Sequence, residues 1–68
     1  MKSVPGKDFI SVLEQPGWRV LRINGSHHAC GKTGDPSRIS FPVHGNRPIK
    51  EGLLLYFLKL AGLTEDDL

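Results

Sequence analysis

Glycine and proline interrupt this chain so often that it can form only short helices and strands. Its 68 residues include eight glycines and five prolines, spread from Pro5 to Gly62. The longest apolar run, Leu53 to Leu58, is far shorter than the roughly 20 residues that a membrane-spanning helix needs. We expect one small domain, residues 1–68, with a thin core and no room for a dinucleotide-binding or kinase fold.

The cysteine content and the N-terminus indicate the cellular compartment. Cys30 is the one cysteine, so no disulfide can form within the chain. Residues 1–5, Met-Lys-Ser-Val-Pro, contain no hydrophobic signal region. We therefore expect a soluble, cytoplasmic protein with no membrane partner.

Positive charge is concentrated ahead of the last four residues. The net charge is +2, but three of the seven acids are Glu65, Asp66 and Asp67. Residues 1–64 carry nine basic and four acidic side chains, a net charge of +5. A basic body fits an anionic partner such as RNA, and ordinary solubility charge is the alternative explanation. Residues 64–68 are expected to form a capping box followed by an acidic, frayed end.

Hydrophobic spacing predicts two helices on either side of three strands. Phe9, Val12 and Leu13 recur at helical spacing within residues 7–15, and Pro16-Gly17 ends that helix. A second helix spans residues 50–61 and ends at Gly62. Between the helices, β-branched and aromatic residues predict strands at 18–24, 27–33 and 38–44, with turns at 24–26 and 34–37.

This order of elements, α-β-β-β-α, predicts an α+β fold with a three-stranded antiparallel sheet and both helices on one face. Pro42 indicates that the third strand lies at a sheet edge or at a bulge. In the first turn we expect a positive φ at Gly25 and also at Asn24. Ser26 is expected to hydrogen-bond the turn backbone rather than to act as a nucleophile.

Five motifs occur in an order that is typical of a known family. They are Gly17-Trp18, Asn24-Gly25-Ser26-His27-His28, Pro42-Val43-His44-Gly45-Asn46, Lys50-Glu51-Gly52-Leu53 and Leu58-Lys59-Leu60-Ala61-Gly62-Leu63. With these motifs the chain resembles the HicA family of toxin–antitoxin modules over nearly its whole length. The resemblance implies a double-stranded-RNA-binding-domain-like fold. It also implies an mRNA interferase, a small endoribonuclease that is held inactive by a HicB-type antitoxin.

Histidine chemistry fits RNA cleavage without a metal ion. The reaction needs a base for the 2′-hydroxyl proton and an acid for the leaving 5′-oxygen, and the pKa of histidine suits both roles. The resemblance favours His27, which follows Gly-Ser, as the catalytic residue, with His28 as the second choice. Adjacent strand residues point to opposite faces, so only one of the two can reach the open face of the sheet. His44 is a second acid–base group, an RNA contact or a loop-capping residue.

Four basic side chains near these histidines in the sequence are candidate phosphate contacts, with a solvated surface charge as the alternative for each. They are Lys32, Arg38, Arg47 and Lys50. The histidines and the cysteine supply enough donors for zinc, but their spacing is not a usual zinc pattern. We therefore expect no metal site and no cofactor.

Two segments depart from the family pattern. Residues 30–31 are Cys-Gly, where the resemblance implies an aromatic residue and a polar or basic one, so a base-stacking group is lost. In the second helix, Leu55 and Tyr56 replace a basic pair and extend the apolar surface. That surface is an interface for the antitoxin or for a second copy in a homodimer, or it packs against the first helix. A catalytically degenerate RNA-binding module and a protein-interaction module are the alternatives to an enzyme.

Overall fold

The computed structural model describes residues 3–68 and has the predicted order of elements. Helix α1 spans Gly6–Glu14 and helix α2 spans Glu51–Ala61. Strands β1, β2 and β3 span Arg19–Asn24, His27–Lys32 and Asp35–Pro42, and a short 3-10 helix, η1, spans Glu65–Asp67. Residues 1 and 2, part of the segment considered for a signal sequence, lie outside the described residues.

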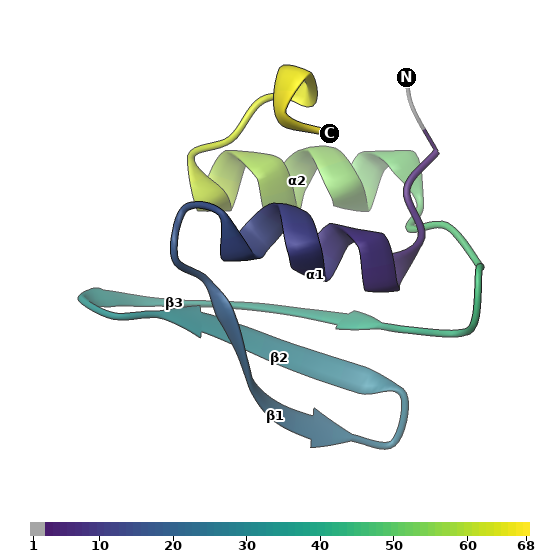
Figure 1. The fold of residues 1–68 in the computed structure, drawn as a ribbon, viewed down its shortest axis with the longest axis horizontal. Coiled ribbons are helices and arrows are strands. Elements are labelled where there is room, and N and C mark those ends of the chain that lie inside the picture. The colour runs from purple at the N-terminus through teal and green to yellow at the C-terminus, as the bar shows by residue number, and fades with distance from the viewer. Residues whose placement is uncertain (1–2) are drawn as a thin grey trace.

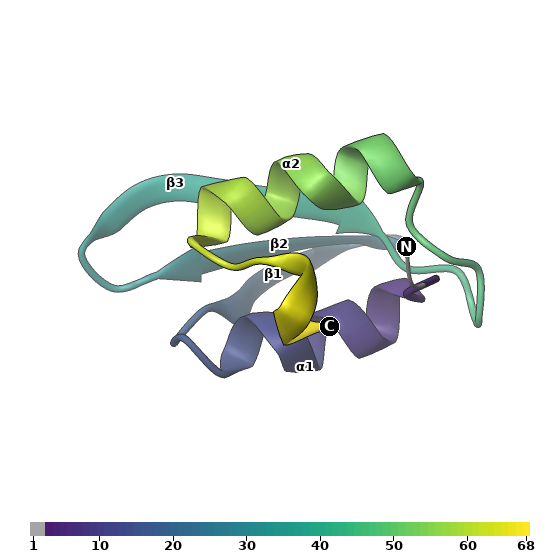
Figure 2. The same cartoon turned by 90° about the horizontal axis from the view of Figure 1, so that it is seen from above.

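The three strands form one antiparallel sheet in the order β1-β2-β3, and both helices cover the same face of it (Figure 1). Figure 2 shows the helices side by side, with α2 over β3. The opposite face of the sheet has no covering layer in the described residues (Figure 1). The predicted α-β-β-β-α fold with two helices on one face is therefore confirmed. Pro42, on the edge strand β3, lies where its missing N–H is tolerated.

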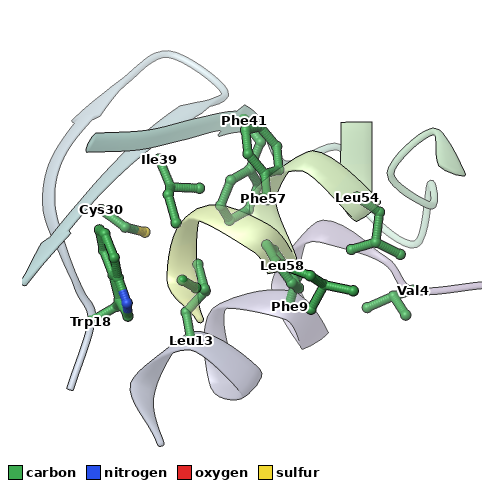
Figure 3. Close-up of a cluster of buried hydrophobic side chains, with 11 residues drawn as sticks. Val4, Phe9, Leu13, Trp18, Cys30, Ile39, Phe41, Leu54, Phe57 and Leu58 are labelled. Carbon is green, nitrogen blue, oxygen red and sulfur yellow. The ribbon is translucent and has the colours of Figure 1, made fainter. Parts of the chain in front are cut away.

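Three phenylalanines join α1, β3 and α2 in the core. The ring centroids of Phe9 and Phe41 are 5.5 Å apart, and those of Phe41 and Phe57 are 5.8 Å apart. Trp18, just before β1, and Cys30 of β2 lie next to each other at another part of this core (Figure 3). Burying these large rings between helices and sheet is the main source of stability in so short a chain.

The third strand begins earlier than predicted. Asp35 pairs with Lys32, so the chain reverses over Thr33 and Gly34, and Gly34 has a φ of 83°. The predicted turn at 34–37 is therefore wrong, because Asp35 and the two residues that follow it belong to β3, and the strand ends at Pro42 rather than at residue 44. The first turn has the expected positive φ of 63° at Gly25, whereas Asn24 does not have a positive φ.

A β-bulge in β1 explains why its sequence alternates imperfectly. Arg19 pairs with Gly31 and Arg22 pairs with Ala29, so β1 uses one more residue than β2 over this stretch. Leu21 is the extra residue. Because a bulge resets the alternation of side chains, Arg19 and Arg22 reach the same face of the sheet, although three positions would ordinarily separate them onto opposite faces.

Residues 64–68 form a capped turn, whereas a frayed end was predicted. The capping box is present, and the backbone N–H of Thr64 donates to Asp67 Oδ2 at 2.8 Å. Leu68 is partly buried and packs against the core. Figures 1 and 2 place η1 over the helix layer, on the side away from the sheet. None of the helices within residues 3–68 has the length and hydropathy of a membrane-spanning segment.

Candidate functional site

The uncovered face of the sheet carries three rows of residues that continue across all three strands. The rows are Arg19–Gly31–Arg38, Arg22–Ala29–Ser40 and Asn24–His27–Pro42. The residues that alternate with them include Cys30, Ile39 and Phe41, which are buried under the helices. These rows hold three arginines and no carboxylate, so this face has a positive potential that suits an anionic ligand.

His27 is exposed at the start of β2, on this uncovered face. Together with Arg22, Asn24, Ala29 and Ser40 it lines a shallow hollow of about 310 Å³. An imidazole and a guanidinium therefore border the same hollow. The pair combines a group that can donate or accept a proton with a fixed positive charge that suits a phosphate.

His28 has a different environment. It lies between Ile23 and Phe41 in the strand pairings and is half-buried on the helix side of the sheet. Its Nδ1 lies 3.1 Å from the carbonyl oxygen of Ser26, and because a carbonyl can only accept, Nδ1 donates this hydrogen bond. The same carbonyl accepts the N–H of Val43 at 2.7 Å. The prediction that only one of the two adjacent histidines faces the open side is confirmed, and it is His27 that does.

A second hollow of about 370 Å³ lies where β3 leads into α2. His44, Arg47 and Lys50, three of the predicted RNA contacts, line it together. Pro42 also lines it, and Pro42 is the strand partner of His27. The structure thus brings these three residues to the same end of the sheet as His27.

The other two predicted basic contacts lie at the opposite end of β2. The guanidinium of Arg38 lies over Gly31, and its Nη1 donates to the carbonyl oxygens of Ser37 at 2.9 Å and Asp35 at 3.2 Å. The Lys32 side chain runs beside Gly17. At about 3.3 Å per strand residue, Gly31 and His27 are roughly 13 Å apart along β2. The five predicted basic and histidine contacts are therefore divided between two ends of the molecule.

Sequence reasoning missed Arg22, the basic side chain that shares the hollow with His27. Its position depends on the bulge at Leu21 and on the pairing of β1 with β2. The irregular alternation of residues 18–24 was the only sequence signal for that bulge.

Cys30 faces the core, so an aromatic residue at that position would not stack on RNA at the open face. Burial raises the pKa of its thiol above the ordinary value of 9.0, and Glu14 adds a smaller contribution in the same direction. Cys30 and His27 belong to opposite faces of the sheet. Within residues 3–68, no three His, Cys, Asp or Glu side chains are grouped so that they would hold a metal ion.

The outer surface of α2 is apolar and exposed to solvent. Leu55 is 42% exposed and Tyr56 is 57% exposed, so neither packs closely against α1. At 100° per helical residue the two side chains point in clearly different directions, and Tyr56 shares its side of the helix with Leu53 and Leu60. The predicted interface residues are thus available to a partner, but they do not form one continuous stripe.

Comparison with protein families gives a match over residues 6–63 to the family described as HicA toxin of bacterial toxin-antitoxin. Comparisons with curated proteins and with solved structures gave no match. The matched range runs from the first residue of α1 to just beyond α2, so it includes the whole sheet and both hollows. The chain therefore belongs to the HicA family of toxins of bacterial toxin–antitoxin systems.

Proposed function

We propose that this protein is an endoribonuclease that cleaves mRNA in the cytoplasm, with His27 as its general acid or base. The observation that supports this most directly is the position of His27. It is exposed on the arginine-bearing face of the sheet and shares a hollow with Arg22. His28, in contrast, donates to the Ser26 carbonyl on the helix side and serves the turn rather than the substrate.

The reaction that suits this site is transesterification by the RNA itself. The 2′-hydroxyl attacks the adjacent phosphorus as a base removes its proton, and the bond to the 5′-oxygen breaks as that oxygen gains a proton. The products are a 2′,3′-cyclic phosphate and a 5′-hydroxyl. His27 performs one of the two proton transfers, and Arg22 stabilises the negative charge that develops on the phosphorane. No step in this scheme requires a metal ion or a cofactor.

Purified protein incubated with labelled single-stranded RNA in the presence of a chelator tests this function. We expect fragments with 5′-hydroxyl ends. Intact RNA at protein concentrations that bind the RNA would contradict the enzyme and favour the catalytically degenerate RNA-binding module. Cleavage that stops when the chelator is added would contradict the metal-independent scheme.

Members of a toxin–antitoxin family act together with an antitoxin, and we propose that a HicB-type protein covers His27 and the arginine rows of this chain. Such a partner would neutralise the toxin by excluding RNA. Titration of antitoxin into Arg22→Ala and Tyr56→Ala variants separates the two candidate surfaces. A loss of affinity confined to Tyr56→Ala would place the antitoxin on α2 and contradict coverage of the open face.

The exposed side chains of α2 support a second candidate function, a protein-interaction module. Leu53, Leu55 and Tyr56 are each more than 40% exposed, so three large apolar side chains of one helix are open to a partner. In this case the free protein would form a homodimer through α2. In sedimentation equilibrium, the apparent mass of the unmodified free protein would then rise with concentration. The apparent mass of Tyr56→Ala would not.

A further inference from the structure

We propose that the hollow between β3 and α2 binds one unpaired nucleotide of the RNA next to the phosphate that is cleaved. This inference rests on the proposed ribonuclease function and extends it, because the nucleotide held there would select the bond that is cut. The substrate class is single-stranded RNA, since a base must leave its helix to enter a hollow of this kind.

The walls of the hollow have the two chemistries that a nucleotide needs. Pro42, Pro48, Ile49 and Leu53 provide apolar surface against which a base can pack. Arg47 and Lys50 provide positive charge for a phosphate oxygen. The volume of about 370 Å³ lies within the range of small-molecule sites, and no acidic residue lines the hollow.

Its position relates it to His27. Pro42 pairs with His27 across β2 and β3, and neighbouring strands are about 4.8 Å apart. Pro42 therefore lies beside His27 and also forms part of the wall of the hollow that contains Arg47. An RNA strand that places a phosphate at His27 would therefore have its neighbouring nucleotide beside Pro42, where the second hollow begins.

Backbone hydrogen bonds hold the segment that forms the hollow. The N–H of Arg47 donates to the His44 carbonyl at 2.9 Å, and the N–H of Ile49 donates to the Val4 carbonyl at 2.9 Å. Pro48 also forms an isolated antiparallel β-bridge with Pro5, the residue before α1. The connection is thus tied to the body of the domain, so little ordering is needed when a ligand binds.

The hollow at the other end of the open face is a weaker candidate. It is lined by Arg19, Leu21 and Arg38, but the Arg38 guanidinium already donates to two carbonyl oxygens of its own strand. Leu21 and Arg38 also lie close above Gly31 and occupy the surface that a base would need.

The test is titration of nucleoside 5′-monophosphates into isotope-labelled protein, observed by NMR, with ribose 5-phosphate as the probe that lacks a base. We expect shifts at Ile49, Leu53 and Arg47 with the nucleotides, and weaker binding of ribose 5-phosphate. Leu53→Ala should weaken nucleotide binding by roughly five- to tenfold, because the base would lose apolar surface to pack against. Leu55→Ala is the matched control, because Leu55 is 42% exposed against 43% for Leu53 but does not line the hollow.

A second pair of variants tests the contribution of the positive charge in the hollow. Lys50→Ala, at the N-cap of α2, should weaken binding of every phosphate probe, whereas Lys59→Ala, in the last turn of α2 and outside the hollow, should not. Equal affinity for ribose 5-phosphate and nucleotides would contradict a base subsite. Chemical-shift changes confined to residues outside the hollow would also contradict a base subsite there.

Cleavage assays then separate this inference from the proposed function. If the protein cleaves RNA and Leu53→Ala leaves both the cleaved bonds and their relative rates unchanged, the subsite is wrong and the ribonuclease stands. If nucleotides bind in the hollow but RNA is never cleaved, the ribonuclease is wrong and the nucleotide site stands.

Discussion

His27 and Pro42 are direct partners across strands β2 and β3. The exposed imidazole therefore lies beside a proline that also borders the hollow containing His44, Arg47 and Lys50. The first residue of β2 and the last residue of β3, the two open ends of one hairpin, meet at this pair. The candidate acid–base group and most of the candidate RNA contacts are thus gathered at one end of the sheet.

Arg22 is expected to support cleavage because it shares a hollow with His27. Arg22→Ala should lower kcat/KM for single-stranded RNA by about 100-fold, the typical cost of losing one stabilising group at a developing charge. Lys59→Ala removes an exposed charge in the last turn of α2 and should have no comparable effect. A result of equal size for both variants would show that only the overall charge matters.

Gly31 and Gly52 are expected to respond to alanine with opposite signs. A Cβ at Gly31 would lie 2.5 Å from Leu21 Cδ1, whereas a Cβ at Gly52 would meet nothing within 4 Å. Gly31→Ala should lower the free energy of unfolding by about 1 kcal/mol, since the exposed Leu21 side chain can rotate away at modest cost. Gly52→Ala should raise it by about 0.5–1 kcal/mol, because alanine favours the helix.

Urea unfolding of both variants measures these changes. The double variant Leu21→Ala/Gly31→Ala tests the cause, because removal of the Leu21 side chain should eliminate most of the cost of Gly31→Ala. Simple additivity of the two single variants would mean that Leu21 does not lie over Gly31.

His28 is expected to matter for stability rather than for cleavage. His28→Ala removes the hydrogen bond to the Ser26 carbonyl and some half-buried surface beside Phe41. The free energy of unfolding should fall by about 1–2 kcal/mol, as is typical for one hydrogen bond with some packing. Ser26 keeps its bond from the Val43 N–H, so the turn should persist. Thermal unfolding followed by circular dichroism measures the loss, and an unchanged melting temperature would contradict this role.

Cys30 is expected to destabilise the protein at alkaline pH. Burial, and to a smaller extent Glu14, raises the pKa of its thiol above 9.0 in the folded protein. As pH rises past 9.0, the unfolded chain loses the thiol proton before the folded chain does. The free energy of unfolding should therefore decrease above that pH.

Urea unfolding on either side of pH 9.0 measures this effect, with Cys30→Ala as the control that lacks the titrating thiol. The same burial should make the folded thiol slow to react with a disulfide reagent, and denaturant should release it. A folded thiol that reacts as fast as the unfolded one would contradict the buried position.

Local sequence rules predicted the elements well and the site only in part. The helix ends at Pro16-Gly17 and at Gly62 followed from residues whose backbone preferences are strong. The early start of β3 was missed because Asp35 and Pro36 favour turns locally, whereas pairing of Asp35 with Lys32 extends the strand.

The site depends more on pairing than on composition. Arg22 reaches the hollow of His27 only because Leu21 is the extra residue of the bulge in β1. Arg38 lies far from His27 because its guanidinium lies over Gly31, near the other end of β2. Neither relationship can be obtained from the spacing of residues within one strand. The opposite faces of His27 and His28, in contrast, follow from strand alternation alone, so the sequence was sufficient for that part.

The rate of cleavage of labelled single-stranded RNA by His27→Ala and His28→Ala, with chelator present and folding verified by circular dichroism, tests the central claim most directly. His27→Ala should lose at least about 100-fold in rate, the usual contribution of a general acid or base. His28→Ala should cleave at nearly the unmodified rate at a temperature where it is folded. Retained cleavage in folded His27→Ala, or loss confined to folded His28→Ala, would contradict the assignment of His27 as the acid–base group.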